Sequence, residues 1–176
     1  MALSHETVIQ KISEKFGDAV SNFTEPYDML TFEVSSNKAI ELMQFLRDDE
    51  TLRFKFLTTM CGIHYPDSET ERQFAVVYQM HNWVDNVRIR FKAYLNGDYP
   101  EIETATNLFT CTNWMEREAY DFYGIIFNGH PDLKRILNMD EMVSFPMRKE
   151  FPLEDANRTD KDDRYFGRIP QNTNAN

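Results

Sequence analysis

The segments "QFAVVYQMH", residues 73–81, and "VRIRFKAYL", residues 87–95, decide the fold class of this chain. In the first, apolar side chains occupy every second position from Phe74 to Met80. In the second they do so from Val87 to Leu95, and the positions between them carry cations: Arg88, Arg90 and Lys92. Only the short stretch "NWVDN" joins the two segments. This alternation predicts a β-hairpin with one apolar face and one polar face.

The sequence before the hairpin predicts elements that cover this apolar face. Two further segments alternate as strands do, "DMLTFEV" and "RFKFLTTM", the second through Phe54, Phe56, Thr58 and Met60. Two others show the helical spacing of apolar residues, and both have candidate capping residues: Val8, Ile9, Ile12 and Phe16 after Ser4, and Ile40, Met43 and Leu46 after Ser36 or Asn37. A one-sided sheet must be covered by helices. The predicted fold is therefore α+β, with a mixed or antiparallel sheet and helices packed on one face.

Composition limits the classes of function. Hydrophobic residues make up 41% of the 176 residues, which indicates a globular protein. The formal net charge of -10 argues against binding to nucleic acid, which requires a basic surface. Neither a signal peptide nor a run of about 18 apolar residues is found. We therefore expect a protein that reaches a membrane only through partners.

The composition changes after Leu153. The segment from residue 154 to residue 176 is polar, and its only large apolar residues are Tyr165, Phe166 and Ile169. Such a segment cannot bury enough surface to fold alone. We predict a domain at residues 1–153 and an extended partner-binding arm at residues 154–176; a disordered tail is the alternative, and "RYFGRIP" favours the arm.

Motifs for bound cofactors are missing from the sequence. None of the six glycines forms GxGxxG or GxxxxGK[ST], so bound NAD, FAD or ATP is not expected. Cys61 and Cys111 do not have the spacing of a CxxC pair or of an iron–sulfur ligand set. We interpret both as buried structural thiols and predict that this chain binds no cofactor.

The stretch "NWMEREAYDFYG", residues 113–124, concentrates charge in a predicted helix. Asn113 and Glu116 have the spacing of a capping box, and Gly124 can end the helix. Arg117 is expected to pair with Asp121 one turn on, or with a carboxylate of the following loop. One earlier helical turn is predicted at residues 103–109. On this interpretation the cluster is structural.

A metal site is the alternative interpretation of the same cluster. Glu118 and Asp121 share a helix face, and His130 follows the helix. Helices that bind two iron ions pair Glu with His at this spacing, whereas this chain has Asp. A stand-alone metal-dependent enzyme that uses these three residues remains an alternative hypothesis.

Two short segments after the helix are marked by proline and basic residues: "HPDLKRIL" and "FPMRKEFPL". Their mixture of cations and apolar residues suits docking against another protein. Lys134, Arg135, Arg148 and Lys149 are the candidates to meet carboxylates across such an interface. A solvated surface is an equally good explanation of these residues.

The stretch "EREAYDFYGIIFNGHPDLKRIL" resembles the signature of the 30-kDa subunit family of respiratory NADH–quinone oxidoreductase, complex I. The residues that match this signature are Glu116, Arg117, Glu118, Asp121, Phe122, His130, Pro131, Lys134, Ile136 and Leu137. The similarity extends over roughly residues 54–153, through "VRIRFKAYL" and "PMRKEFPL". The chain departs from the family pattern at Ser144 and Phe145, at His64, and in "DFYGI".

The resemblance implies a subunit without a redox centre in the peripheral arm of the complex. The complex uses NADH, flavin, iron–sulfur clusters and quinone, and couples electron transfer to proton translocation. The implied partners are other peripheral-arm subunits, especially the quinone-site subunit, at the cytoplasmic face of a bacterial inner membrane. The equivalent component of a related membrane-bound hydrogenase, or of a dehydrogenase with another electron donor, is the alternative within the wider family.

Overall fold

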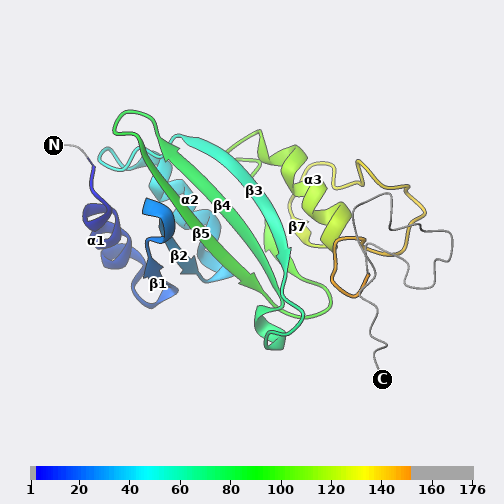
Figure 1. Ribbon diagram of the computed structural model, residues 1–176. Coiled ribbons are helices and arrows are strands. Elements are labelled where there is room, and N and C mark those ends of the chain that lie inside the picture. Colours follow the sequence, from blue (N-terminus) through cyan, green and yellow to red (C-terminus); the bar gives the residue numbers. More distant parts are fainter. Residues whose placement is uncertain (1–2, 152–176) are drawn as a thin grey trace, which may run out of the picture.

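A computed structural model describes residues 3–151 and shows a five-stranded mixed sheet in the order β1-β2-β5-β4-β3 (Figure 1). The α+β class is confirmed. The strands of this sheet are β1 (Val20–Thr24), β2 (Leu30–Val34), β3 (Phe56–His64), β4 (Phe74–Asn82) and β5 (Val87–Leu95). The α-helices are α1 (His5–Phe16), α2 (Ala39–Asp48) and α3 (Thr112–Tyr123), and a small second sheet pairs β6 (Glu101–Glu103) with β7 (Ile126–Asn128). Short 3-10 helices lie at Gly17–Ala19, Pro26–Asp28, Ser36–Lys38 and Thr70–Arg72.

The predicted hairpin forms the centre of the sheet. β4 and β5 pair antiparallel without a break, from Phe74 opposite Leu95 to Asn82 opposite Val87. On its other side β5 pairs with β2 in parallel, which makes the sheet mixed. The hairpin is therefore confirmed, and it joins the N-terminal strands to β3.

The apolar face of the sheet carries the core. Phe32, Phe91 and Tyr78 stack across three neighbouring strands, with ring centroids 5.7 Å and 5.1 Å apart. Figure 1 shows α1 and α2 on the same side of the sheet. Phe16 of α1 and Phe45 of α2 lie 5.8 Å apart, so the two helices also contact each other. None of the described α-helices lies on the opposite face of the sheet, which Arg72 of the 3-10 helix Thr70–Arg72 contacts at Tyr94 and Glu33.

Helix α3 packs along the edge strand β3. Gly62 of β3 makes this approach possible, because a Cβ atom at this position would lie 2.8 Å from Tyr123 Cδ2. After α3 the chain pairs β7 with β6 in parallel and then crosses the surface as an irregular segment. The position of α3 thus requires glycine, which has no side chain, at position 62 of β3.

The structure corrects several details of the predicted elements. β1, β6 and β7 were not predicted, because each is short and only partly apolar. The alternation in β3 was predicted wrongly, since an irregularity between Leu57 and Thr59 shifts the register and leaves Phe56 exposed. The single helical turn predicted at residues 103–109 is found in the second half of that range, where the Phe109 amide donates to the Ala105 carbonyl at 2.9 Å.

The predicted helix caps have mixed outcomes. Ser4 Oγ accepts a hydrogen bond from the Thr7 amide, so the first cap is confirmed. Neither Ser36 nor Asn37 caps α2, because the 3-10 helix at Ser36–Lys38 runs directly into it. Asn113 lies inside α3, which begins at Thr112, so the predicted capping box is wrong. The predicted end of α3 at Gly124 is confirmed by its left-handed φ of 74°.

Both cysteines are exposed, which contradicts the prediction of buried thiols. In β3, Met60 and Gly62 point toward the core, so Cys61 between them points away from it. Cys111 lies in the turn before α3. An apolar sequence context therefore did not indicate burial at either position.

Replacing Gly124 by Ala tests how tightly the following segment is packed against the end of α3. A Cβ atom at Gly124 would lie 2.6 Å from the Phe145 ring and 2.8 Å from Arg148 Nη2. Gly97 has a similar φ of 70° but nothing within 4 Å of its Cβ position. Both substitutions force a left-handed residue, which costs about 1–2 kcal/mol. We expect Gly124→Ala to cost a further amount of about 1–3 kcal/mol from overpacking.

Urea unfolding of the two variants measures this difference. Equal losses of free energy of unfolding would show that the contact with Phe145 is not tight.

Candidate functional site

The candidate site consists of α3 and the segment that follows β7. We call residues 129–151 the C-terminal loop, since they contain neither helix nor strand. In Figure 1 this loop, coloured yellow to orange, passes beside α3. Hydrogen bonds of several charged or titratable side chains fix its shape.

The Asp121 carboxylate on α3 accepts five hydrogen bonds from the C-terminal loop. Oδ2 accepts from the backbone amides of Ile136, Leu137 and Asn138, at 3.1, 2.8 and 3.0 Å. Oδ1 accepts from Arg135 Nη1 at 2.8 Å and from Asn138 Nδ2 at 3.0 Å. Three successive amides around one carboxylate form an anion-binding nest. The loop therefore wraps around a charge that belongs to the helix.

Arg135 completes this arrangement. Its side chain is 8% exposed, and its Nη1 also donates to the Asp121 carbonyl at 2.9 Å. Its Nη2 donates to the carbonyls of Met142 at 2.6 Å and Ser144 at 3.2 Å. One guanidinium thus connects the helix to two later points of the loop.

The environment of Asp121 changes its acidity. Burial alone would raise the pKa of its carboxyl group. The amides of Asn138 and Leu137 and the Arg135 guanidinium outweigh burial and hold the pKa well below its usual range. The carboxylate is therefore charged throughout the physiological range and supports the loop as an anion.

The structure pairs Arg117 differently from the prediction. Its Nε donates to the Lys134 carbonyl at 3.1 Å and its Nη2 to the Arg135 carbonyl at 3.3 Å. Its guanidinium also lies 5.0 Å from the centre of the Trp114 ring. The predicted pair with Asp121 is wrong, because Arg135 already binds that carboxylate.

Glu116 anchors the opposite side of α3. Its fully buried carboxylate accepts from Thr104 Oγ1 at 2.5 Å and from the Ala105 amide at 2.7 Å. It therefore binds the turn after β6 and not the start of its own helix. Burial raises the pKa of Glu116, although the Thr104 hydroxyl and the Ala105 amide oppose the shift.

His130 and Arg148 hold the two ends of the C-terminal loop. His130 Nδ1 accepts from the Asp132 amide at 3.0 Å, so Nε2 carries the proton and donates to the Asn113 carbonyl at 3.1 Å. Arg148 Nε donates to the Tyr123 carbonyl at 2.8 Å, and its guanidinium lies 4.7 Å from the centre of the Phe145 ring. Both residues thus close the loop onto α3.

A further contact ties the loop to the sheet. The Lys149 amide donates to His64 Nδ1 at 2.9 Å, and the His64 ring stacks on Phe74 at 4.5 Å. Burial lowers the pKa of His64, although Glu150 opposes the shift. The neutral ring is the form that accepts this amide.

The geometry does not favour the metal-site hypothesis. Asp121 is saturated by N–H donors, His130 uses both ring nitrogens within the chain, and Glu118 is exposed. Among residues 3–151, no three His, Cys, Asp or Glu side chains are grouped to hold a metal ion. The cluster instead serves to hold a loop.

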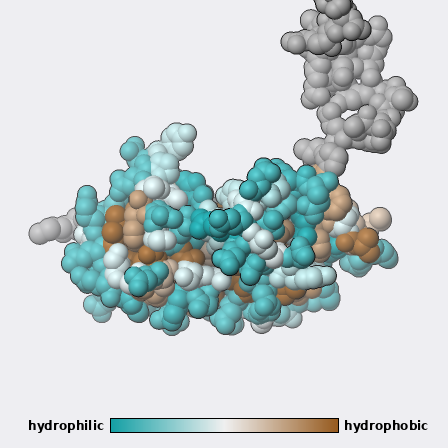
Figure 2. All heavy atoms as spheres, turned by 90° about the horizontal axis from the view of Figure 1, so that it is seen from below, coloured by the Kyte–Doolittle hydropathy of each residue, from teal (hydrophilic) through white to brown (hydrophobic). Residues whose placement is uncertain are grey.

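The C-terminal loop exposes several apolar side chains to solvent. Leu137, Met139 and Val143 are exposed, Val143 to 95%. Figure 2 shows apolar residues on the surface at the end of the molecule where the C-terminal loop lies. Contiguous patches of exposed apolar side chains are typical of protein-binding surfaces. Leu137 ends the segment "HPDLKRIL" that the sequence marked for docking, whereas Met139 and Val143 were not predicted, because isolated apolar residues in an irregular loop have no period.

The other predicted site residues have different surroundings. Pro131, Lys134 and Lys149 are exposed, and Phe122 is half-buried. The guanidinium groups of Arg135 and Arg148 already bind acceptors within the chain. Of the three predicted partner-contact residues in the loop, Lys149 is therefore the one whose side chain is most available to a partner. Tyr165 and Phe166 lie outside the described residues. The interface assignments stay predictions.

The sequence of this chain is similar to those of known proteins. The model of a family described as "Respiratory-chain NADH dehydrogenase, 30 Kd subunit" matches residues 32–157. The chain belongs to this family. The match includes the hairpin, α3 and the C-terminal loop.

Individual relatives agree with the family assignment. The chain is 41% identical to a NADH-quinone oxidoreductase subunit of Rhizobium etli over 143 residues, covering 81% of this chain and 74% of the relative. It is 35% identical to a NADH-quinone oxidoreductase subunit of Roseiflexus sp. over 97% of this chain and 98% of the relative. A solved structure, "Nqo5 of the trypsin-resistant fragment (1-134)", is 30% identical, covers 73% of this chain and 98% of its own, and has a TM-score of 0.59. These similarities show that the fold is that of the 30-kDa subunit.

Within residues 3–151, no helix of this family member is both long enough and apolar enough to cross a bilayer.

Replacing Asp121 by Asn tests the nest. The amide has nearly the same shape but removes the charge, and leaves the Arg135 guanidinium buried without an anion. We expect a loss of about 3–5 kcal/mol in the free energy of unfolding. Asp132→Asn is the matched control, because Asp132 pairs with Lys134 at the exposed surface and its loss should change little. Equal effects in urea unfolding would contradict the role of the nest.

The wild type and Asp121→Asn also differ in a predictable way with pH. Since folding lowers the pKa of Asp121, its stabilisation is fully present above the pKa of the unfolded chain, about 3.9. It is lost as the pH falls from there toward the folded-state value. The stability difference between the two proteins should therefore be constant from about pH 5 to 7 and shrink below about pH 4. A difference that grows on acidification would rule out this mechanism.

Proposed function

We propose that this chain is a structural subunit of NADH–quinone oxidoreductase that supports electron transfer from NADH to quinone, coupled to proton translocation, without itself being catalytic. The observation that carries the proposal is an exposed apolar loop fixed by the Asp121–Arg135 network. A loop that uses a buried ion pair to fix its own shape, and shows Leu137, Met139 and Val143 to solvent, is suited to assembly and not to chemistry.

The donor set on this chain supports the same proposal. An iron–sulfur cluster takes four cysteine ligands or a mixture of cysteine and histidine, and this chain has two cysteines. They occupy separate elements, β3 and the turn before α3. The flavin, the iron–sulfur clusters and the NADH and quinone sites of the complex are accordingly assigned to other subunits.

The partner that we propose for the C-terminal loop is the quinone-site subunit. Exposed apolar residues form the centre of such an interface, and Lys134 and Lys149 would lie at its polar rim. Arg135 and Arg148 would act there indirectly, by fixing the loop. The arm at residues 154–176 would extend the contact through Tyr165 and Phe166. The chain would then sit at the cytoplasmic face of a bacterial inner membrane through its partners.

A triple variant, Leu137→Ser, Met139→Ser and Val143→Ser, tests the proposed surface. Because the three side chains are exposed, the free energy of unfolding should change by less than about 0.5 kcal/mol. Recovery of the quinone-site subunit with the tagged chain should fall at least about tenfold, the ratio for 1.4 kcal/mol of binding energy. Tyr99→Ser is the control, since Tyr99 is an exposed aromatic residue outside the loop.

The outcomes separate assembly from chemistry. Full recovery of the complex with the triple variant would contradict the proposed surface. Full recovery with loss of NADH–quinone turnover would indicate a catalytic role. Recovery of hydrogenase subunits in place of the NADH-binding subunits would assign the chain to the related complex. Deleting residues 154–176 tests the arm in the same assay.

A further inference from the structure

The face of the sheet that is turned away from the helices carries an unusual row of cations. Arg88, Arg90 and Lys92 alternate along β5 with residues of the core, so all three side chains lie on this open face. They are spaced by two residues each, about 6.7 Å in a strand. We call these three residues the basic row. In a chain with a net charge of -10, such a row on a central strand requires a reason.

No carboxylate within residues 3–151 forms an ion pair with the basic row. Glu33 is the register neighbour of Lys92, but its carboxylate binds Arg72 Nη2 at 2.9 and 3.0 Å. Like charges about 7 Å apart repel one another in the absence of counter-charges. The row is therefore complementary to an acidic surface.

Arg90 also lacks hydrogen-bond acceptors for its guanidinium group. Its Nε atom is shielded from solvent and has no hydrogen-bond partner among the described residues. Within residues 3–151, the one acceptor of its Nη2 is the Met29 sulfur at 3.4 Å, which is a weak acceptor. An unpaired charged donor costs free energy that an oxygen acceptor would restore.

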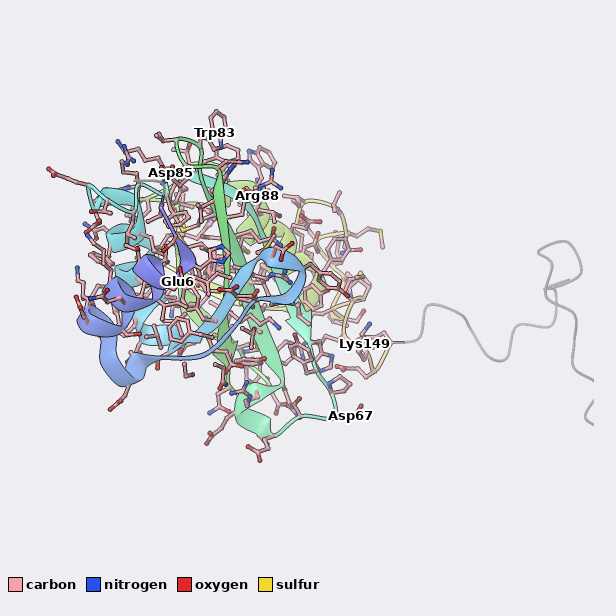
Figure 3. The ribbon with its side chains drawn as sticks, turned by 60° about the vertical axis from the view of Figure 1, so that its left-hand side comes forward. Glu6, Asp67, Trp83, Asp85, Arg88 and Lys149 are labelled. Carbon is pink, nitrogen blue, oxygen red and sulfur yellow. The ribbon has the colours of Figure 1, made fainter. Side chains whose placement is uncertain are left out.

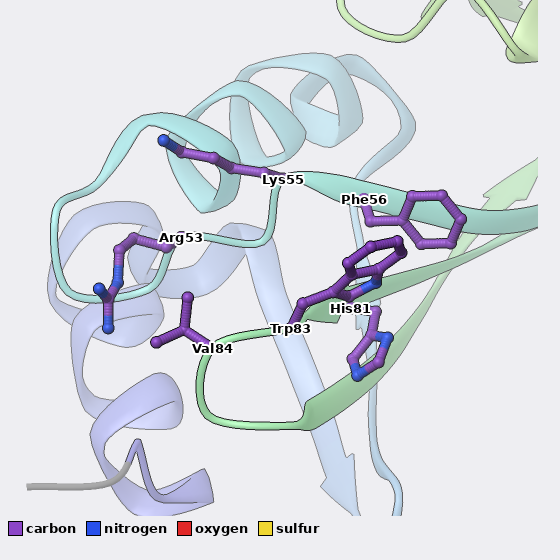
Figure 4. Close-up of a pocket in the computed structure, with 6 residues that line it drawn as sticks. All are labelled: Arg53, Lys55, Phe56, His81, Trp83 and Val84. Atoms are coloured by element: carbon purple, nitrogen blue, oxygen red, sulfur yellow. The ribbon is translucent and has the colours of Figure 1, made fainter.

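An apolar surface adjoins the basic row at the hairpin end. Phe56, His81 and Arg88 are successive register partners across β3, β4 and β5, so they lie side by side on the open face. Trp83 lies 4.9 Å from the Phe56 ring and is 67% exposed. Figure 4 shows the two rings next to each other, with His81 beside Trp83. We call Phe56 and Trp83 the aromatic corner.

The aromatic corner is hollowed and has a basic rim. A depression of about 390 Å³ is lined by both aromatic residues together with Val84, Arg53 and Lys55, and no acid lines it. Arg53 has a positive φ of 47° and a shielded Nε without a partner in residues 3–151, although its Nη2 pairs with Asp85 at 3.1 Å, so Lys55 is the rim cation without an ion pair among these residues. Residues in unusual backbone conformations gather at binding sites. The depression suits an apolar side chain that arrives with acidic neighbours.

We propose that the basic row and the aromatic corner form a docking surface for an acidic segment of another protein. That segment would present carboxylates about 7 Å apart, as alternate residues of an extended chain do, and an apolar anchor that fills the depression. With Arg53 and Lys55 counted, the surface carries five cations, which is within the about 4–8 that bind anionic lipid, so a lipid surface is an outcome that the test must distinguish. Nucleic acid is disfavoured by the net charge.

This surface is separate from the C-terminal loop. Figure 3 shows Trp83 and Arg88 near one end of the sheet, and Lys149 away from them. The inference rests on the proposed function only in assuming that the chain works within an assembly. If both surfaces are occupied at once, the protein contacts two neighbouring proteins and connects them.

Photo-crosslinking in the native complex tests the proposal. Trp83 is replaced by p-benzoylphenylalanine in the full chain, and the crosslinked peptide is identified by mass spectrometry. Tyr99, an exposed aromatic residue outside the surface, carries the probe in the control. We expect the Trp83 probe, but not the control, to link to a peptide of another protein with at least two carboxylates within reach of the row.

A charge reversal then tests the basic row. Arg88→Glu with Lys92→Glu should lower the crosslink yield at least tenfold, while Lys15→Glu with Lys38→Glu, an equal change of charge on the helix side, should leave it unchanged. Circular dichroism and co-purification of the complex show for each variant that the chain folds and assembles. A yield that is insensitive to the row would overturn its part in the surface.

Every other result overturns the proposal. A link to a peptide without acids, to lipid, or to residues 152–176 of the chain itself would each identify a different occupant. Absence of any link in a complex that assembles normally would show that the surface is unoccupied, and would leave the proposed function intact.

Discussion

The carboxylate of Asp121 joins parts of the chain that have no other reason to be close. Its three backbone donors are successive residues of an irregular loop, and its ionic partner Arg135 is itself bound to two later carbonyls. Without that anion, three amides would converge on an empty space with a buried guanidinium beside them. No apolar residue of the loop is fully buried, so hydrogen bonds to a charge stabilise it where a core stabilises other segments.

The rest of the C-terminal region extends from this point in both directions along α3. Glu116, on the other side of the helix, holds the turn after β6, and Arg117 holds the carbonyls that precede the nest. Charges that resemble a reactive cluster in the sequence are thus distributed over three separate structural tasks. Side chains of α3 thus hold the neighbouring segments in place through hydrogen bonds.

How far the sequence could predict this depends on the range of the interactions. The β4–β5 hairpin and the core face of α1 follow from local periodicity and were predicted correctly, whereas the predicted face of α2 includes Met43 and Leu46 but misses the buried Leu42. The partner of Asp121 was not predicted correctly, because the sequence offers Arg117 at the favourable spacing of four residues and Arg135 at fourteen. Only the loop's path decides between them. The irregularity at Leu57 was equally hidden, since a single extra residue in one strand leaves no trace in composition.

The parallel pairing of β2 with β5 has a consequence for the order of folding. Leu30 and Ile89 are neighbours in the sheet but lie 59 positions apart in the chain. During synthesis, β2 and the two helices leave the ribosome long before the strand that pairs with them, and their apolar faces have no cover in that interval. Closure of such a long-range parallel pair is slow compared with that of a hairpin. The nascent N-terminal part is therefore expected to expose apolar surface until the hairpin has been synthesised and β5 pairs with β2.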